Sequence, residues 1–289
     1  MTVAIGYALG AMVLYGLGDF VFKQAAIAAM RGEFKTHHFV MMQSGLFFCC
    51  TLLFVFAAGD PGLGWPVLWG TAAGVFMFVG FNNFAWSLRE GNVSLNAPIF
   101  RLNFIVTSAL AIVLLAEPLT VLKLAGLALA LAAIWLLMGA GAGGAAIMTP
   151  AAKRSLLLAV SATLALGAGN FLHKIGLSQG AKPATLLSAH SFVFLVLSTL
   201  AAVRADAGLS IPRSVWKYSA AGAMMTSGGF LLLLRALSDA DASVVVPIAQ
   251  MGLLVTAALG VLVLREAITP RKLAGLAAAV AALGALAAS

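Results

Sequence analysis

Ten long runs of apolar residues follow one another along this chain, separated by short polar or glycine-rich stretches. Their approximate limits are 3–29, 38–58, 65–87, 94–115, 120–140, 156–177, 184–203, 215–236, 243–264 and 271–288. A helix needs about 20 predominantly apolar residues to cross the ~30 Å hydrocarbon core of a bilayer. The pattern therefore predicts an all-α membrane protein with ten transmembrane helices.

The composition agrees with a membrane environment and narrows the classes of partner. Hydrophobic residues make up 62% of the chain and charged residues only 9%, whereas a soluble domain carries about 25% charged residues. The net charge of +8 does not indicate nucleic acid, because the basic residues are scattered between apolar runs. The first run lacks a basic flank and a cleavage site, so we expect a retained helix and not a signal peptide.

The second half of the sequence repeats the first half. Residues 92–126 align with 241–275 at an offset of 149, and GDFVFK (18–23) aligns with GNFLHK (169–174) at an offset of 151. The identities least expected in apolar sequence are Pro98/Pro247, Thr107/Thr256, Glu117/Glu266, Lys123/Lys272 and Gly126/Gly275. We expect a first five-helix repeat over 1–141, a Gly/Ala-rich linker over 142–154 and a second five-helix repeat over 155–289.

Five helices per repeat is an odd number, so the second copy must cross the membrane in the opposite direction. Inverted repeats of this kind recur in transporters, with the substrate site at the repeat interface. A non-transporting membrane scaffold, or a subunit of a larger complex, is the alternative. Lys and Arg are concentrated in the connections after the odd-numbered helices, so the positive-inside rule places both termini outside the cytoplasm.

The ends of the two repeats carry the most specific motifs, AEPLTVLKLAG (116–126) and REAITPRKLAG (265–275). In these motifs and in its ten-helix duplication the chain resembles the EamA-type members of the drug/metabolite transporter superfamily. The resemblance implies a secondary carrier in the cell membrane, or the inner membrane of a bacterium. It also implies a central cavity open to one side at a time and, often, export of amino acids, other metabolites or drugs.

Asp19 and Lys23 place opposite charges inside the first apolar run. Such residues cost roughly 2.5–3.5 kcal/mol at the bilayer centre and usually face a cavity or the bundle interior. Positions i and i+4 share a helix face, so the two side chains can pair. The second repeat has Asn170 and Lys174 at the aligned positions. We expect a solute-binding role, with snorkelling of Lys23 to the interface as the alternative.

Arg101 lies well inside the fourth run and aligns with Gln250 in the ninth. A guanidinium suits a carboxylate or phosphate of a solute, although a structural salt bridge to Asp19 or a contact with backbone carbonyls would also explain it. Asn103 belongs to a polar stripe of the same run. We expect all three of Arg101, Asn103 and Gln250 to bind solute.

Each of the other polar side chains at membrane depth has both a functional and a structural explanation. Asn82 and Trp86 share a face of the third run, which suits an amphipathic or aromatic solute, but Trp86 is equally explained as an interface anchor. His190 titrates near neutral pH and is, with Asp19, a candidate for proton coupling; a hydrogen-bonded structural histidine is its alternative. Glu117 stands at a helix–loop junction, where we expect capping or loop pairing.

Motifs for other classes of function are missing from the sequence. There is no phosphate loop, no His/Cys/Asp spacing typical of a metal site and no nucleophile–base pair. Gly16-Leu17-Gly18-Asp19 fits the GxGD pattern of intramembrane aspartyl proteases, but no second carboxylate lies in an apolar run to share a proton. We therefore expect no enzyme activity, no cofactor and no metal.

These observations together predict a carrier that moves a small organic solute by alternating access, driven by proton antiport or exchange, with export favoured. The expected substrate-binding residues are Asp19, Lys23, Asn82, Trp86, Arg101, Asn103, Asn170, Lys174 and Gln250. We expect the fifth and tenth helices to be peripheral, because they lack internal charge. Partners are then the lipid bilayer and a small-molecule substrate but no nucleic acid, and a homodimer is left open.

Overall fold

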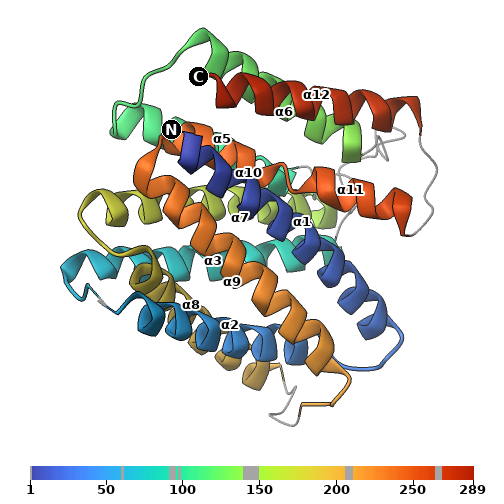
Figure 1. Ribbon diagram of the computed structural model, residues 1–289. Helices are drawn as coiled ribbons and strands as arrows, with labels where there is room; N and C mark the ends of the chain where they lie inside the picture. The colour runs from blue at the N-terminus through green and yellow to red at the C-terminus, as the bar shows by residue number, and fades with distance from the viewer. Residues whose placement is uncertain are drawn as a thin grey trace.

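The computed structural model describes residues 2–59, 62–90, 96, 99–138, 150–205, 211–263 and 269–289. Apart from one short 3-10 turn, Trp65–Val67, the elements of this part are α-helices (Figure 1). They are α1 (Thr2–Met30), α2 (Thr36–Ala58), α3 (Leu68–Glu90), α5 (Asn103–Leu114), α6 (Val121–Met138), α7 (Pro150–Ser178), α8 (Pro183–Arg204), α9 (Val215–Asp239), α10 (Ala242–Gln250), α11 (Leu253–Leu262) and α12 (Pro270–Ala287).

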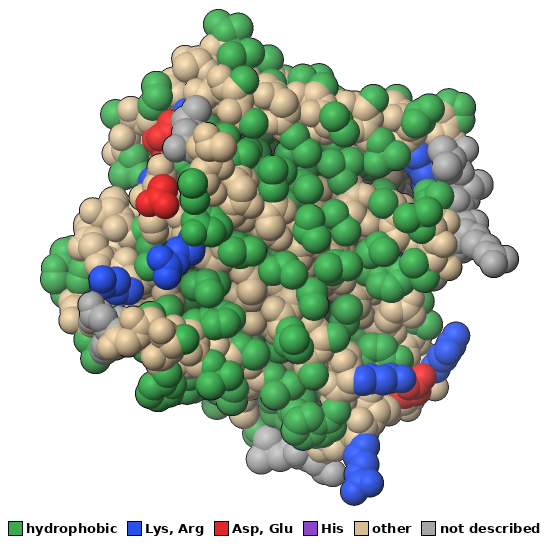
Figure 2. Space-filling model, viewed as in Figure 1, with side chains coloured by type: hydrophobic (Ala, Val, Ile, Leu, Met, Phe, Trp, Pro, Cys, Tyr) green, Lys and Arg blue, Asp and Glu red, His purple; other side chains and the backbone are tan. Residues whose placement is uncertain are grey.

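Within the described residues, eight helical segments are long and apolar enough to cross a membrane, and one of them, Ala242–Leu259, runs through α10 into α11. The fourth and fifth apolar runs form shorter helices, Ile99–Leu114 and Val121–Leu137. Figure 2 shows apolar side chains over much of the visible face, with the charged side chains near its edges. The prediction of an all-α, multi-pass membrane protein is confirmed, while the full count of ten spans stays a prediction.

The principal helix contacts join the first repeat to the second. α1 packs on α9 and α3 on α7, while α2 packs on α8, α6 on α12 and α5 on α10. In Figure 1, α6 and α12 lie side by side along the upper margin, and α2 and α8 lie together near the lower one. In both the α1–α9 and the α3–α7 contact, the first helix of one repeat packs on the third helix of the other. Each repeat therefore buries its helices against the other repeat. The boundary expected at 142–154 falls largely outside the described residues, and α7 already begins at Pro150.

The fourth helix of each repeat is interrupted at the aligned position. The backbone N–H of Leu102 bonds to the carbonyl of Ile99 at 3.0 Å, and that of Met251 bonds to Ile248 at 3.1 Å. These are i→i−3 bonds, which tighten the chain where regular α-helix stops. Pro247 lies inside α10, where it removes one backbone donor and disturbs the preceding turn. A discontinuous helix at matching positions of two repeats is typical of transporter binding sites.

The two repeats approach each other closely beside these interruptions. Thr256 Oγ1 donates to the Gly16 carbonyl at 3.1 Å, and its aligned partner Thr107 donates to the Gly167 carbonyl at 3.0 Å. A Cβ atom built on Gly16 would lie 2.4 Å from the carbonyl oxygen of Gly252. Glycine is therefore required at this crossing, because no side chain fits between the two backbones. This crossing fixes the first helix of one repeat against the fourth helix of the other.

Candidate solute-binding site

A cavity of about 280 Å³ opens beside the interrupted fourth helix of the first repeat. Five elements contribute to it: α1, the turn before α5, the last turn of α6, α11 and the first turn of α12. The lining residues are Asp19, Lys23, Arg101, Leu137, Leu253, Thr256, Ala257 and Lys272. Segments from both repeats thus meet here, as the repeat interface of a transporter predicts.

Asp19 and Arg101 form an ion pair across this cavity. α1 supplies the carboxylate, and the turn that interrupts the fourth helix supplies the guanidinium. The side chains are 27% and 21% exposed, respectively, so both charges remain in contact with the cavity. The sequence left open whether Arg101 meets Asp19 or a solute. The structure shows the pairing with Asp19 and also places both groups where a solute can reach them.

Lys23 lies one turn beyond Asp19 on α1 and lines the same cavity. The i, i+4 spacing puts both side chains on one face of the helix. Because that face is turned toward the cavity, Asp19 and Lys23 are placed as the sequence predicted. Their contact with a solute stays a prediction.

Lys272 and Thr256 also line the cavity, and the prediction from the sequence missed them as site residues. Lys272 lies in the first turn of α12 and Leu137 in the last turn of α6, so the expectation that these helices are wholly peripheral is wrong at one end of each. The duplication held a signal: Lys272 aligns with Lys123 and Thr256 with Thr107. A search for polar residues that occur at aligned positions of both repeats would have identified both as candidates.

Charged side chains from both repeats line the cavity. Among the described residues they are the cations Lys23, Arg101 and Lys272 and the carboxylate of Asp19. The remaining wall is largely apolar and comes from Leu137, Leu253 and Ala257. This combination of clustered polar groups and apolar surface is typical of sites for small organic molecules. An anionic group would be attracted to it electrostatically.

The aligned residues of the second repeat lie outside the lining of this cavity. Lys174 Nζ donates to the carbonyls of Leu237 and Ala240, both at 2.8 Å, at the C-terminal end of α9. The Asn170 side-chain amide nitrogen lies 3.5 Å from Asn103 Oδ1, in a contact between α7 and α5. Gln250 is half-buried at the end of α10. Solute binding by these residues stays a prediction that this cavity does not support.

Asn82 and Trp86 on α3 lie apart from the cavity as well. Trp86 is 43% exposed, which agrees with its alternative role as an anchor at the membrane interface. The neighbouring Asn83 donates to Ser161 Oγ at 3.0 Å, linking α3 to α7. The polar face of α3 therefore contributes at least one contact between the repeats.

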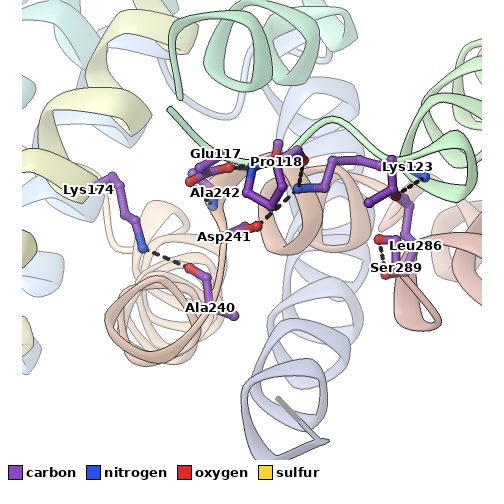
Figure 3. A network of polar contacts seen from close by, with 11 residues as sticks. Glu117, Pro118, Lys123, Lys174, Ala240, Asp241, Ala242, Leu286 and Ser289 are labelled. Carbon is purple, nitrogen blue, oxygen red and sulfur yellow. Dashed lines mark hydrogen bonds and ion pairs between the residues drawn. The ribbon is translucent and has the colours of Figure 1, made fainter. Parts of the chain in front are cut away.

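A network of polar contacts between charged groups lies near the other end of α6 from the cavity (Figure 3). Glu117 accepts hydrogen bonds from the backbone N–H groups of Ala242 at 2.7 Å and Ser243 at 2.9 Å. These residues begin α10, where free N–H groups and the helix dipole favour a carboxylate. The expected capping role of Glu117 is confirmed, and the capped helix belongs to the other repeat. Ala116, just before it, has a left-handed φ of 53°, a conformation that L-residues adopt at a cost.

Lys123 completes this network from the first turn of α6. Its Nζ donates to Asp241 Oδ2 at 3.0 Å and to the Pro118 carbonyl at 2.7 Å, and the side chain is 1% exposed. Figure 3 shows Lys123 and Asp241 pointing toward each other across the boundary between the repeats. We call Glu117, Lys123, Lys174 and Asp241 the bridged end, and Asp19, Lys23, Arg101 and Lys272 the cavity end. Lys123 and Leu137 occupy the first and last turns of α6, so the two ends lie ~20 Å apart.

His190 lies in the bundle interior next to His173. The two ring centroids are 5.1 Å apart, and the Phe230 ring packs edge-on against His190 at 5.2 Å. Both side chains are at most 1% exposed. Within the described residues, Nδ1 of His190 and both ring nitrogens of His173 have no hydrogen-bond partner. A role of His190 in proton coupling stays a prediction, as does its alternative of a hydrogen-bonded structural histidine.

Comparisons with known proteins agree with this architecture. The model of the EamA-like transporter family matches residues 2–139 and again residues 153–287. No curated protein matches the sequence. One solved structure, titled only "Crystal structure of protein", superposes with a TM-score of 0.80 at 15% identity, covering 99% of this chain and 96% of that chain. At this identity the superposition establishes a shared fold.

Proposed function

Because the chain belongs to the EamA-like transporter family, we propose that it is a secondary carrier that moves a small organic solute across the cell membrane. The observation that carries the proposal is the cavity between the repeats, where Asp19, Arg101 and Lys272 converge beside an interrupted helix. Charged side chains are expensive in the bilayer interior and mark solute pathways when they meet in a cavity.

The two ends of the molecule support an alternating-access cycle on two inverted repeats. At the bridged end, groups from both repeats are joined by Glu117 and Lys123. At the cavity end, the repeat-matched cations line an open space. If the repeats are related by a two-fold axis, rocking one against the other would close the cavity and release the bridges. Exchange between these two arrangements would expose the solute to each side in turn.

For coupling, we propose proton antiport or exchange, with His190 as the interior proton carrier. Its neighbour His173 offers a second imidazole at 5.1 Å, and their buried ring nitrogens are available to a proton or a polar solute group. Asp19, the other candidate, is held in an ion pair with Arg101, so a solute that displaces Arg101 would free its carboxylate. If the termini lie outside the cytoplasm, the cavity end faces the cytoplasm, which favours export.

The proposal is tested by ligand binding and by exchange in proteoliposomes. Purified protein is screened by thermal shift with amino acids, organic anions and organic cations, and the best ligand is then used in radiolabelled counterflow. We expect at least one solute to raise the melting temperature and to exchange faster than in protein-free liposomes. Arg101→Gln should lower both signals. If no solute raises the melting temperature or exchanges, the carrier function is wrong.

The same variants separate a carrier from a membrane scaffold. A scaffold predicts that Asp19→Asn, Lys23→Met and Arg101→Gln leave function unchanged, because none of these groups would then contact a solute. A carrier predicts loss of exchange with folding intact. Thermal unfolding of each variant without ligand provides the control for folding.

A further inference from the structure

We propose that the surface where the end of α1 meets the start of α9 binds the headgroup of an anionic phospholipid of the phosphatidylglycerol type. Three exposed cations at this place carry the inference: Arg31, Arg213 and Lys217. We call them the basic seam. The inference depends on the placement of the helices in a membrane and is independent of the carrier function proposed above.

Contacts between the two repeats bring these cations to one surface. Phe34, which follows α1, packs on Val215 at the start of α9, and its ring centroid lies 5.9 Å from that of Tyr218. The Ser214 hydroxyl donates to the Glu33 carbonyl at 3.1 Å. Each cation of the basic seam lies within two residues of one of these contacts. One headgroup can therefore reach cations of both repeats.

The connections that form this surface carry more cations than carboxylates over their whole length. Residues 31–35 and 204–217 include five Lys and Arg against two acidic residues, Glu33 and Asp206. Asp206 lies outside the described residues, and the count already includes it. Figure 2 shows Lys and Arg side chains together with an acidic one at the lower right, where Figure 1 places the end of α1 and the start of α9. Clustered cations next to transmembrane helices attract anionic headgroups.

The basic seam keeps its cations next to exposed apolar side chains. Met30, directly before Arg31, is 80% exposed, and Trp216, directly before Lys217, is 51% exposed. Tryptophan is typical of the boundary between headgroups and acyl chains. Lys217 Nζ lies 4.7 Å above the Tyr218 ring, a cation–π contact that holds this ammonium group at the seam. A lipid offers a phosphate to the cations and its glycerol and acyl carbons to Met30 and Trp216, whereas a free phosphate offers only the first.

A lipid at the basic seam would act on the contact between the repeats. α1 and α9 pack against each other, and a headgroup shared by Arg31 and Arg213 would add a second link between them. Lys23 of the cavity lies seven residues before Met30, which is about 10 Å along α1. A ligand that binds the folded protein raises its melting temperature. Anionic lipid should therefore stabilise this protein beside its cavity end.

Thermal-shift titration in a neutral detergent compares lipids that differ only in the headgroup. We expect dioleoyl phosphatidylglycerol to raise the melting temperature and dioleoyl phosphatidylcholine to leave it nearly unchanged. Glycerol 3-phosphate and inorganic phosphate, which lack acyl chains, should have no effect at the same concentration. Raising the salt concentration to about 1 M shortens the Debye length to about 3 Å and should remove most of the stabilisation by phosphatidylglycerol.

Substitutions in the basic seam and a matched control locate the site. Arg213→Gln should weaken phosphatidylglycerol binding about fivefold, and the double variant Arg31→Gln/Arg213→Gln about 25-fold. Lys153→Gln removes an exposed cation from the first turn of α7, outside the seam, and should leave the affinity unchanged. The substituted side chains are all exposed, so the melting temperatures without lipid should match that of the unchanged protein.

Three results would overturn the inference. Equal stabilisation by phosphatidylcholine would show that the acyl chains act without the headgroup charge. Equal stabilisation by inorganic phosphate or glycerol 3-phosphate would assign the seam to a free anion. An unchanged response of the double variant to phosphatidylglycerol would place the lipid at other cations. None of these results bears on the carrier function, which counterflow tests separately.

Discussion

The bridged end and the cavity end use matching positions of the two repeats and reach opposite outcomes. Lys123 at the bridged end is buried against Asp241, whereas Lys272 at the cavity end lines an open space. Lys174 is held by backbone carbonyls of α9, whereas its counterpart Lys23 faces the cavity. Lys123 therefore joins the two repeats at one end, Lys174 stabilises the end of α9 within the second repeat, and Lys23 and Lys272 line a cavity at the other end.

Single substitutions between the repeats account for this difference. Asp19 and Arg101 make an ion pair in the cavity, while Asn170 and Gln250 occupy the aligned positions without charge. Duplication provides two similar ends, and the aligned residues that differ give them different ion pairs. Whether a lysine in such a repeat joins helices or lines a cavity therefore depends on the residues around it at its own end of the molecule, and not on its position in the repeat alone.

The largest expected effect is at the bridged end. Glu117→Ala removes the carboxylate that caps α10 and leaves the backbone N–H groups of Ala242 and Ser243 without this acceptor. Breaking a buried network by removing one partner costs about 3–5 kcal/mol, so the free energy of unfolding in mixed micelles should fall by that amount. The free energy of unfolding of Glu117→Gln should lie between those of the unchanged protein and Glu117→Ala. An unchanged unfolding curve for Glu117→Ala would show that the bridges do not stabilise the fold.

Introducing the charged residues of the cavity end at the aligned positions of the second repeat should lower the free energy of unfolding by nearly as much. Asn170 is 2% exposed, and Asn170→Asp would bury a carboxylate without a cation, lowering the free energy of unfolding by about 3 kcal/mol. Adding Gln250→Arg should recover part of the loss by recreating the ion pair of the first repeat. A double-mutant cycle measures this coupling. Strictly additive effects would show that the two repeats do not place these positions equivalently.

The helix crossing beside the cavity should tolerate no added methyl group. Gly16→Ala would bring a Cβ atom to 2.4 Å from the Gly252 carbonyl oxygen, and overpacking of this kind costs about 2 kcal/mol. Gly6→Ala on the same helix is the matched control, because nothing lies within 4 Å of its added Cβ. Thermal unfolding in detergent checks both variants. Equal melting temperatures would mean that α1 and α11 separate easily at this point.

The smallest effect is expected on binding at the cavity end. Asp19→Asn removes the carboxylate that competes for the guanidinium of Arg101. The exposure of this pair limits its strength to about 1 kcal/mol, so the affinity for an organic anion that the thermal-shift screen identifies should rise by about fivefold. Isothermal titration of both proteins measures the change. A weaker affinity would indicate that Asp19 orients Arg101 for the solute instead of competing with it.

Several features of the site could be predicted from sequence because they depend on local pattern. The i, i+4 spacing placed Asp19 and Lys23 on one face, and the loop position of Glu117 predicted a cap. Arg101 was recognised as a charge at membrane depth, with a salt bridge to Asp19 as one of three explanations. Lys272 was missed because residues near the end of an apolar run are expected to lie at the membrane surface. Trp86 was included because helical spacing alone does not distinguish a cavity-facing side from a lipid-facing one.

The sequence by itself determined the all-α class, the apolar segments and the duplication, because a bilayer requires long apolar helices and alignment needs no coordinates. Only the tertiary structure decided which charges meet. Asp19 and Arg101 are 82 residues apart, and Lys272 reaches their cavity from the last helix. Hydropathy is similar on the lipid-facing and helix-facing sides of a membrane helix. The mutual placement of the helices therefore depends on close packing at Gly16, on the interrupted fourth helices and on the bridges between the repeats.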